Sequence, residues 1–190
     1  FGVRRPQMIV TQGALGDQAL ASDRTAPVKA QLPVDRRAVA VSAGANHTCA
    51  VLDDQSVWCW GDDFSGQLGN GGLNQSSEVP SKTILPPGPG AVAVTAGGAH
   101  TCAILSDETT WCWGIGGGGA LGDGTAQDRS TPVQVVAGMG FLLTTAISAG
   151  AASTCAIASD GRAACWGVDS DGQLGDDTSL TGKGTPVPIV

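Results

Sequence analysis

Residues 47–52, His-Thr-Cys-Ala-Val-Leu, and residues 57–61, Val-Trp-Cys-Trp-Gly, form a pair of short segments separated by an acidic turn. The same pair returns at residues 100–114 and, with several substitutions, at residues 153–167. The first cysteine of each pair recurs every 53 residues, and so does the second. A fixed period of this length in a chain of 190 residues indicates a repeat architecture.

The composition favours strands and turns over helices. The chain contains 29 Gly, 10 Pro and 5 Trp but no Tyr, and 14% of its residues are charged. Gly and Pro are typical of turns, and short Val, Ile and Trp runs are typical of strands. The formal net charge of −7 argues against nucleic acid or an anionic membrane surface as the main partner, because both attract clustered Lys and Arg. No segment approaches the roughly 18 to 20 apolar residues of a membrane span.

Each repeat consists of several short segments that predict strands. An apolar segment ends in Ser-Ala-Gly at residues 42–44, and the cysteine-bearing pair follows as an expected hairpin. In the third copy, the turn contains Asp160-Gly161, a strong hairpin signal. Gly-Gln-Leu-Gly at residues 66–69 and a proline-bearing strand, expected at a sheet edge, close the unit. Three or four strands in about 50 residues are typical of one β-propeller blade.

The register of the repeats sets their boundaries. Residues 1–38 are interpreted as a partial, degenerate repeat, because they contain an early copy of the glycine-rich loop at 13–16 but no Trp-Cys-Trp-Gly. We expect full repeats at 39–91, 92–144 and 145–190. The predicted fold class is therefore all-β, with about 3.6 repeats of 53 residues that form a partial propeller or part of a longer ring.

The combined pattern, apolar-x-Ala-Gly-x-x-His-Thr-x-Ala-Leu, Trp-Gly, Gly-Gln-Leu-Gly and Thr-Pro-Val, resembles the repeat of the regulator of chromosome condensation superfamily. The resemblance covers nearly the whole chain and implies a seven-bladed propeller with roughly 50 residues per blade. It does not imply a single function, because the same fold serves a nucleotide exchange factor, a plant ultraviolet photoreceptor and a secreted β-lactamase inhibitor.

The length does not match a complete ring of this kind. Seven blades require almost twice the length of this chain. Two copies cannot form a symmetric seven-bladed ring, because a two-fold axis requires an even number of blades. We therefore expect, in this order, part of a longer polypeptide, an open arc capped by a partner, or half of an eight-bladed dimer.

The six cysteines form three pairs, each with a spacing of ten residues. If the hairpin turn is centred near Asp54, the two cysteines of a pair lie directly opposite each other and project to the same face, where they can form a disulfide. Zinc is a poorer explanation, because each stiff hairpin supplies only two ligands. The predicted disulfides are Cys49–Cys59, Cys102–Cys112 and Cys155–Cys165.

Disulfides persist in oxidising compartments, so we expect an extracytoplasmic protein that is secreted, periplasmic or bound to the cell surface. The alternative, small buried thiols in a reducing cytosol, is less consistent with three identical pairs and no cysteine left over. The chain begins with Phe1 rather than Met, and we expect that a leader or a longer N-terminal part precedes it.

Three residue types recur in phase and form a repeat signature. We interpret the histidines as structural and expect them to hydrogen-bond within their own blade, because a catalytic or metal-binding residue seldom recurs once per blade. The tryptophans are expected to pack in the core or between blades, with an exposed contact surface as the alternative. The signature residues are His47, His100, Trp60, Trp113, Trp166, Gly61, Gly114 and Gly167.

Acidic loops provide weak candidates for calcium ligands, which are Asp169, Asp171, Asp176 and Asp177. Their spacing departs from that of an EF-hand loop and lacks its closing Glu, so turn formation is the better explanation. Asp62 and Asp63 form a less complete version. The stretch 114–119 matches the dinucleotide fingerprint G-x-G-x-x-G, but no helix is expected to follow it. No other cofactor and no catalytic Ser-His-Asp or Cys-His set is indicated.

These observations favour a non-catalytic, exported module that binds protein. The partners expected are other proteins, other copies of the chain or the rest of a longer chain, and neither nucleic acid nor a small-molecule substrate is indicated. Two roles remain open: a subunit of a larger assembly, or a secreted recognition or inhibitor module. The alternatives are an exported hydrolase that uses the acidic loops and, disfavoured by the cysteines, an intracellular propeller of the nucleotide-exchange type.

Overall fold

The computed structural model describes residues 15–17, 26–73, 75–136, 143–178 and 181–190. These residues form three four-stranded antiparallel sheets and one short 3-10 turn, η1 (Gly117–Gly119), which confirms the predicted all-β class. Within them, no helix is long and apolar enough to cross a bilayer. Much of the predicted partial repeat, including its loop at residues 13 and 14, lies outside the described residues.

Each sheet is one propeller blade, and its strands are neighbours in chain order. Blade 1 consists of β1 (Ala38–Ala43), β2 (His47–Leu52), β3 (Val57–Gly61) and β4 (Ser77–Lys82). Blade 2 consists of β5 (Ala91–Ala96), β6 (His100–Leu105), β7 (Thr110–Gly114) and β8 (Arg129–Gln134). Blade 3 consists of β9 (Thr144–Ala149), β10 (Ser153–Ala158), β11 (Ala163–Gly167) and β12 (Lys183–Pro188).

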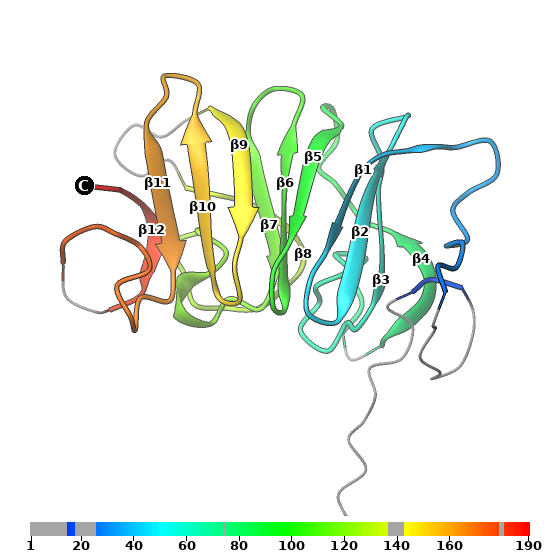
Figure 1. Cartoon of the computed structure of the whole chain (residues 1–190), viewed down its shortest axis with the longest axis horizontal. Helices are drawn as coiled ribbons and strands as arrows, with labels where there is room; N and C mark the ends of the chain where they lie inside the picture. The colour runs from blue at the N-terminus through cyan, green and yellow to red at the C-terminus, as the bar shows by residue number, and fades with distance from the viewer. Residues whose placement is uncertain (1–14, 18–25, 74, 137–142, 179–180) are drawn as a thin grey trace, which may run out of the picture.

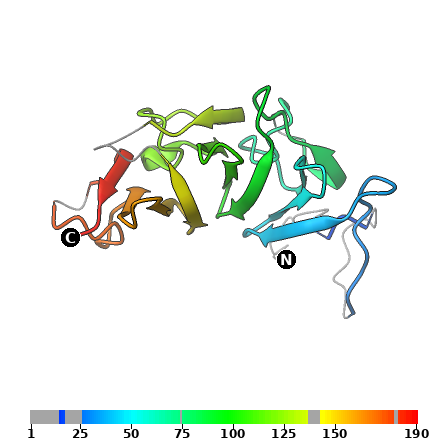
Figure 2. The ribbon, with the colours of Figure 1, turned by 90° about the horizontal axis from the view of Figure 1, so that it is seen from above.

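The blades stand side by side along an open arc (Figures 1 and 2). The first strands β1, β5 and β9 approach one another on the inner side of the arc, whereas the fourth strands fan outward. These fourth strands are sheet edges and contain Pro80, Pro132 and Pro186. An edge position tolerates proline because no strand lies beyond it to require the missing N–H group.

The central hairpin of each blade is set by its acidic turn. Asp54 Oδ1 accepts a hydrogen bond from the backbone N–H of Ser56, two residues further on, at 3.1 Å. Gln55, between them, adopts a left-handed conformation with φ 64°, and the matching residue in blade 3 is Gly161 with φ 86°. This short turn fixes the strand register, so that Cys49 is directly opposite its partner on β3.

The hydrophobic core lies between the blades. One cluster combines Leu68 and the Cys49–Cys59 disulfide of blade 1 with Leu105 and Trp113 of blade 2. All of these side chains are fully buried. A second cluster joins Leu121 of blade 2 to Trp166 of blade 3 in the same way. A blade therefore buries its apolar side chains only when a neighbour covers its flat face.

The Ala-Gly-x-x-His motif of blades 1 and 2 has a packing reason in this geometry. A side chain at Gly44 would collide with the backbone carbonyl of Gly97 in the next blade and with the imidazole of His47. Gly97 has the same relationship to Gly150 and His100. Glycine at this position therefore allows successive blades to approach within backbone contact distance.

Candidate functional site

The two buried histidines connect one blade to the next. His47 Nε2 lies 2.7 Å from the hydroxyl oxygen of Thr101, and His100 Nε2 lies 2.9 Å from that of Thr154. Thr101 in turn donates to the backbone carbonyl of Gln67 at 2.8 Å. The expectation that these histidines bond within their own blade is therefore wrong, because their rings project from the sheet face that the next blade covers.

Both imidazoles are held in a neutral state at physiological pH. Burial lowers the pKa of His47 and of His100 to about 4, and the proximity of His100 lowers that of His47 further. Their Nδ1 atoms have no hydrogen-bond partner in the described part of the chain. A buried neutral ring that bonds a neighbouring hydroxyl is a structural group, so neither histidine is placed for acid-base chemistry.

The tryptophans in phase with the repeat also seal the joints between blades. Trp113 Nε1 donates to the carbonyl of Gln67 at 2.9 Å, and Trp166 Nε1 donates to the carbonyl of Ala120 at 3.0 Å. Trp60 lies against Gly16, at the N-terminal side of blade 1. These rings are almost completely buried, so the alternative of an exposed tryptophan surface does not apply to them.

The structure contains the three predicted disulfides, Cys49–Cys59, Cys102–Cys112 and Cys155–Cys165. Each joins β-strands of one hairpin, and the first two are fully buried by the following blade. Cys155, in contrast, is only half-buried. Three disulfides suggest an oxidising compartment.

Within the described residues, no blade packs on one flat face of the arc, which belongs to blade 3. We define the lateral face of blade 3 by Ser153, Cys155, Ile157 and Gln173, which occupy the positions that a next blade covers in blades 1 and 2. Ile157 is 45% exposed, whereas its counterparts Val51 and Ile104 are 0% and 2% exposed. Gln173 is exposed, whereas Gln67 is buried. This face presents an apolar side chain and a half-buried disulfide to solvent.

The opposite end of the arc is covered by the chain itself. Ala30 and Leu32 pack on a buried cluster formed by Ala50, Leu52 and Trp60 of blade 1. Arg36 adds ion pairs to Asp53 and Asp54 at 3.7 and 3.3 Å. In the described part of the chain, the two ends of the arc therefore differ: the segment before β1 packs on one, and no blade packs on the lateral face of blade 3.

Of the four aspartates proposed as calcium candidates, Asp169, Asp176 and Asp177 line one pocket, and the first two accept hydrogen bonds from their own loops. Asp169 is buried and accepts a hydrogen bond from the backbone N–H of Leu174 at 3.0 Å. Asp176 accepts a hydrogen bond from Thr178, which lowers the pKa of that aspartate. Asp171 and Asp177 are exposed. Among the described residues, no three His, Cys, Asp or Glu side chains are grouped to hold a metal ion.

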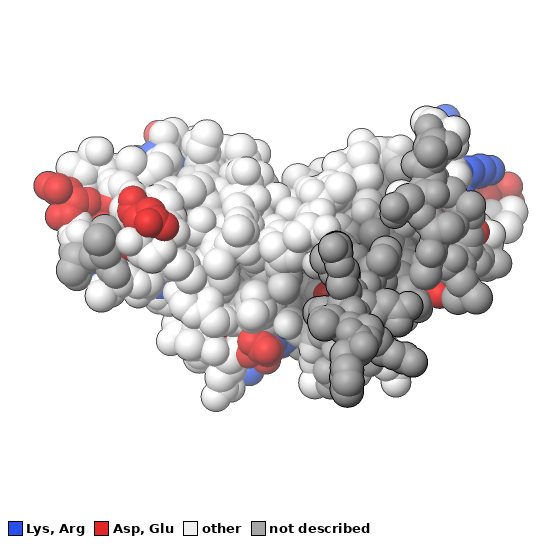
Figure 3. Space-filling view, turned by 60° about the horizontal axis from the view of Figure 1, so that its bottom comes forward, with Lys and Arg blue, Asp and Glu red and all other residues white. Residues whose placement is uncertain are grey.

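Charged residues make up 14% of the chain. On the face drawn in Figure 3, Lys and Arg occur as small separate spots, and Asp and Glu form separate small groups. The glycine-rich stretch 114–119 forms only the three-residue turn η1, which is too short to present a helix N-terminus to a phosphate. The visible surface thus offers no broad basic patch.

The sheet topology and the contacts between blades define a segment of a β-propeller, in which each blade is completed by its neighbours. Sequence profiles of the regulator of chromosome condensation (RCC1) repeat match residues 11–51, 54–104 and 107–157, and a second profile of the same repeat matches residues 38–67 and 145–173. The chain therefore belongs to the RCC1 repeat family.

Individual relatives agree with this assignment. The chain is 34% identical to the ultraviolet-B receptor UVR8 of Arabidopsis thaliana over 164 residues, which cover 85% of this chain and 35% of the receptor. It is 33% identical to the E3 ubiquitin-protein ligase HERC2 of Homo sapiens over 141 residues, which cover 74% of this chain and 3% of that protein. The chain thus spans only about a third of the receptor and a small part of the ligase.

Solved structures share the fold. Yeast RCC1 (Prp20), in a crystal structure with Kap60, superposes with a TM-score of 0.77 at 20% identity, covering 95% of this chain and 43% of that one. Human WBSCR16 superposes with a TM-score of 0.76 at 22% identity, covering 86% and 43%. At these identities, the likeness supports the architecture alone.

Proposed function

We propose that this chain is a non-catalytic, exported protein-binding module whose principal contact surface is the lateral face of blade 3. The observation that carries the proposal is the exposure of Ile157, at a position where the two equivalent side chains are buried by a following blade. An apolar side chain on a flat sheet face gains free energy when a partner covers it.

The contacts at the equivalent joints between blades indicate which chemical groups the partner surface presents. At the joint between blades 1 and 2, the covering surface supplies the hydroxyl of Thr101 and the indole N–H of Trp113, and both donate to the carbonyl of Gln67. Gln173 occupies the position of Gln67 in blade 3. The partner is thus a protein surface with apolar bulk and hydrogen-bond donors, supplied by a further blade, by another copy or by a different protein.

Export is supported by the three disulfides, because glutathione and thioredoxin keep cytosolic thiols reduced. The same observation speaks against a nucleotide-exchange role inside the cell. A non-catalytic role is supported by the recurrence of the histidine in blades 1 and 2, where each one bonds the next blade. An exported hydrolase would instead require free carboxylates in a pocket. Asp169, Asp176 and Asp177 do line one pocket, but the first two already accept hydrogen bonds from their own loops.

Site-specific photo-cross-linking tests the proposed surface. A photoreactive amino acid is placed at position 157 or, as the matched control, at the exposed Val92 on the inner strand β5, in protein purified without denaturation from its own host. We expect protein adducts, identified by mass spectrometry, from position 157 and none from position 92. Equal labelling at both positions, or a protein that is monomeric and forms no adduct at 157, would remove the proposal.

A substitution provides the second measurement. Ile157→Glu places a charge on the lateral face without touching the covered end of the arc, so the native mass measured by light scattering should fall to that of the free chain. Val92→Glu should leave the native mass unchanged. If the mass of the larger particle persists in Ile157→Glu, the contact lies elsewhere.

A further inference from the structure

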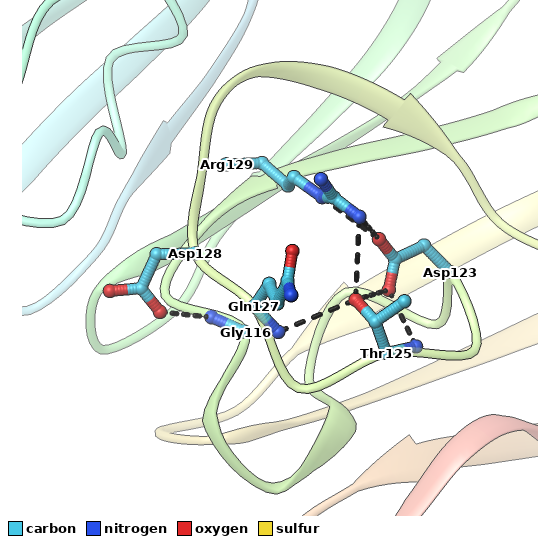
Figure 4. A network of polar contacts seen from close by, with 6 residues as sticks. All are labelled: Gly116, Asp123, Thr125, Gln127, Asp128 and Arg129. Atoms are coloured by element: carbon cyan, nitrogen blue, oxygen red, sulfur yellow. Dashed lines mark hydrogen bonds and ion pairs between the residues drawn. The ribbon is translucent and has the colours of Figure 1, made fainter.

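The loop between the third and fourth strands contains a charged pair in blade 2. Arg129 donates from Nη2 and Nε to Asp123 Oδ2 at 2.8 and 3.0 Å, and Thr125 donates its hydroxyl to Oδ1 at 2.7 Å (Figure 4). The Asp123 carboxylate is therefore paired with a cationic side chain from the start of β8. It also accepts a hydrogen bond from a hydroxyl two residues further along the chain.

Blade 3 repeats this arrangement with other residues. Asp176 occupies the position of Asp123, and it accepts a hydrogen bond from the hydroxyl of Thr178 at 2.7 Å. Lys183, at the start of β12, lies with its Nζ 3.6 Å from the same carboxylate. Both loops thus combine an acid, a threonine hydroxyl and a basic side chain supplied by the fourth strand.

Blade 1 lacks all three of these components. The position of Asp123 is occupied by Asn70. The threonine position is occupied by Gly72, and the basic position at the start of β4 is occupied by Ser77, whose hydroxyl donates to the carbonyl of Val79 at 2.7 Å. No Lys or Arg occurs between residues 61 and 81, whereas Asp62, Asp63 and Glu78 all lie in that stretch. The loop of blade 1 is therefore acidic and contains no Lys or Arg side chain.

Asp63 precedes this loop in blade 1, and its counterparts are Gly116 in blade 2 and Asp169 in blade 3. Its side chain is 0% exposed, and Oδ1 accepts a hydrogen bond from the backbone N–H of Leu68 at 2.9 Å. Oδ2 has no hydrogen-bond partner in the described part of the chain. An oxygen acceptor that is both buried and unpaired costs free energy, which a positively charged ligand can recover.

The space in front of this oxygen is the one that threonine fills in the other two blades. A Cβ atom added to Gly72 would lie 3.5 Å from Asp63 Oδ2 and 3.0 Å from the amide oxygen of Asn70. Asn70 Oδ1 already accepts the backbone N–H of Gly72 at 2.8 Å and has a second lone pair. A carboxylate oxygen and an amide oxygen thus face the same small space.

We propose that the loop of blade 1 binds a calcium ion through Asp63 Oδ2 and Asn70 Oδ1, in the space above Gly72. Calcium is coordinated by carboxylate and amide oxygens together with backbone oxygens and water, and its flexible geometry suits an irregular loop better than the strict octahedron of magnesium. The neighbouring Asp62 carboxylate adds negative potential. Affinity is expected at the level of extracellular modules, with Kd on the order of 10⁻⁴ to 10⁻³ M.

This site differs from the calcium candidates predicted in the third repeat. Asp169 corresponds to Asp63, but the loop of blade 3 supplies Lys183 and Thr178 in the places that a cation would use. The loop of blade 1 therefore lacks both the cationic side chain and the threonine hydroxyl that the other two loops contain. It also contains fewer acidic residues than the loop at 169–177.

Calorimetric titration of the full chain with calcium chloride tests the proposal, with magnesium chloride at equal ionic strength as the reference. We expect calcium to bind with one-site stoichiometry and to raise the thermal midpoint, because a ligand that binds only the folded state stabilises it. Absence of calcium binding at millimolar concentration, or an equal response to magnesium, would overturn the proposal.

Three variants locate the site. Asp63→Asn removes the charged ligand, and Gly72→Thr fills the space with the residue type that blades 2 and 3 use while it keeps every carboxylate. Both should weaken calcium binding by at least about tenfold. Asp169→Asn, the matched change in blade 3, should leave binding unchanged. Retention of binding in Gly72→Thr, or its loss in Asp169→Asn, would place the ion elsewhere and refute the assignment.

Discussion

His47 Nε2 and the hydroxyl oxygen of Thr101 lie 2.7 Å apart although 54 residues separate them in the chain. The pair is repeated by His100 and Thr154. In both cases, the histidine belongs to one blade and the threonine to the next. The signature residues of this repeat therefore stabilise the stacking of blades, and their effects should appear as stability changes.

The free energy of unfolding should decrease as the pH falls, because His47 and His100 bind protons more readily in the unfolded chain. Their pKa is about 4 in the folded chain against 6.5 as the ordinary value, so the unfolded chain binds protons first as the pH falls. Their contribution is fully present above pH 6.5 and is lost between pH 6.5 and 4, at up to about 1.4 kcal/mol per pH unit for each histidine.

Urea unfolding across this pH range measures the effect. His47→Gln should reduce the slope of the unfolding free energy against pH relative to the parent chain. Burial raises the pKa of Asp63 to about 6, which acts in the opposite direction, but that contribution is common to both proteins and cancels in the comparison. An unchanged slope in the variant would contradict the prediction.

Thr101→Val should destabilise the chain by about 1 to 3 kcal/mol, because it leaves the imidazole of His47 without its buried partner and removes one of the two donors to the carbonyl of Gln67. Thr131→Val, at an exposed position of β8, is the matched control and should change stability by less than about 0.5 kcal/mol. Chemical denaturation of the two variants gives the comparison, and equal midpoints would show that the hydroxyl is dispensable.

Gly97→Ala should disturb the joint between blades 2 and 3. The added methyl group would meet the carbonyl of Gly150 and the ring of His100, so the blades must separate, at a cost of at least about 1 kcal/mol. A Cβ at Gly117 would meet only the Ile115 side chain, at 3.9 Å, which is an ordinary contact, so Gly117→Ala serves as the control. Thermal unfolding followed by near-ultraviolet circular dichroism should show a lower midpoint for Gly97→Ala alone.

The disulfide Cys155–Cys165 should be reduced before the other two. Cys155 is half-buried on the open lateral face, whereas the four cysteines of blades 1 and 2 are 0% exposed. Access of the attacking thiolate limits thiol-disulfide exchange. Brief treatment with a thiol reductant, alkylation and peptide mass spectrometry should find label at Cys155 and Cys165 first, and simultaneous labelling of all six cysteines would count against an open face.

Much of the fold could be predicted from the local sequence. The register that places Cys49 opposite Cys59 depends on a hairpin turn of a few residues and on the alternation of side chains along a strand, so spacing alone predicted all three disulfides. The all-β class and the blade-like repeat followed from the fixed period.

Contacts between blades could not be predicted from local spacing or from the repeat period. The partner of His47 was predicted within its own blade, because nothing in a local segment shows how one sheet is rotated against the next. The exposure of Ile157, at a position identical in pattern to the buried Val51, depends on which blade stands at the end of the arc.

The sequence by itself determined the repeat, the hairpins, the disulfide pairs and the family, because each follows from short-range spacing or from the period. Only the tertiary structure decided that the histidines and tryptophans join successive blades. It also decided that, among the described residues, no blade covers the lateral face of blade 3 and Asp63 Oδ2 is buried without a hydrogen-bond partner. The physical reason is that burial and pairing of a side chain are set by the surface packed against it, and in this fold that surface comes from residues about 50 positions away.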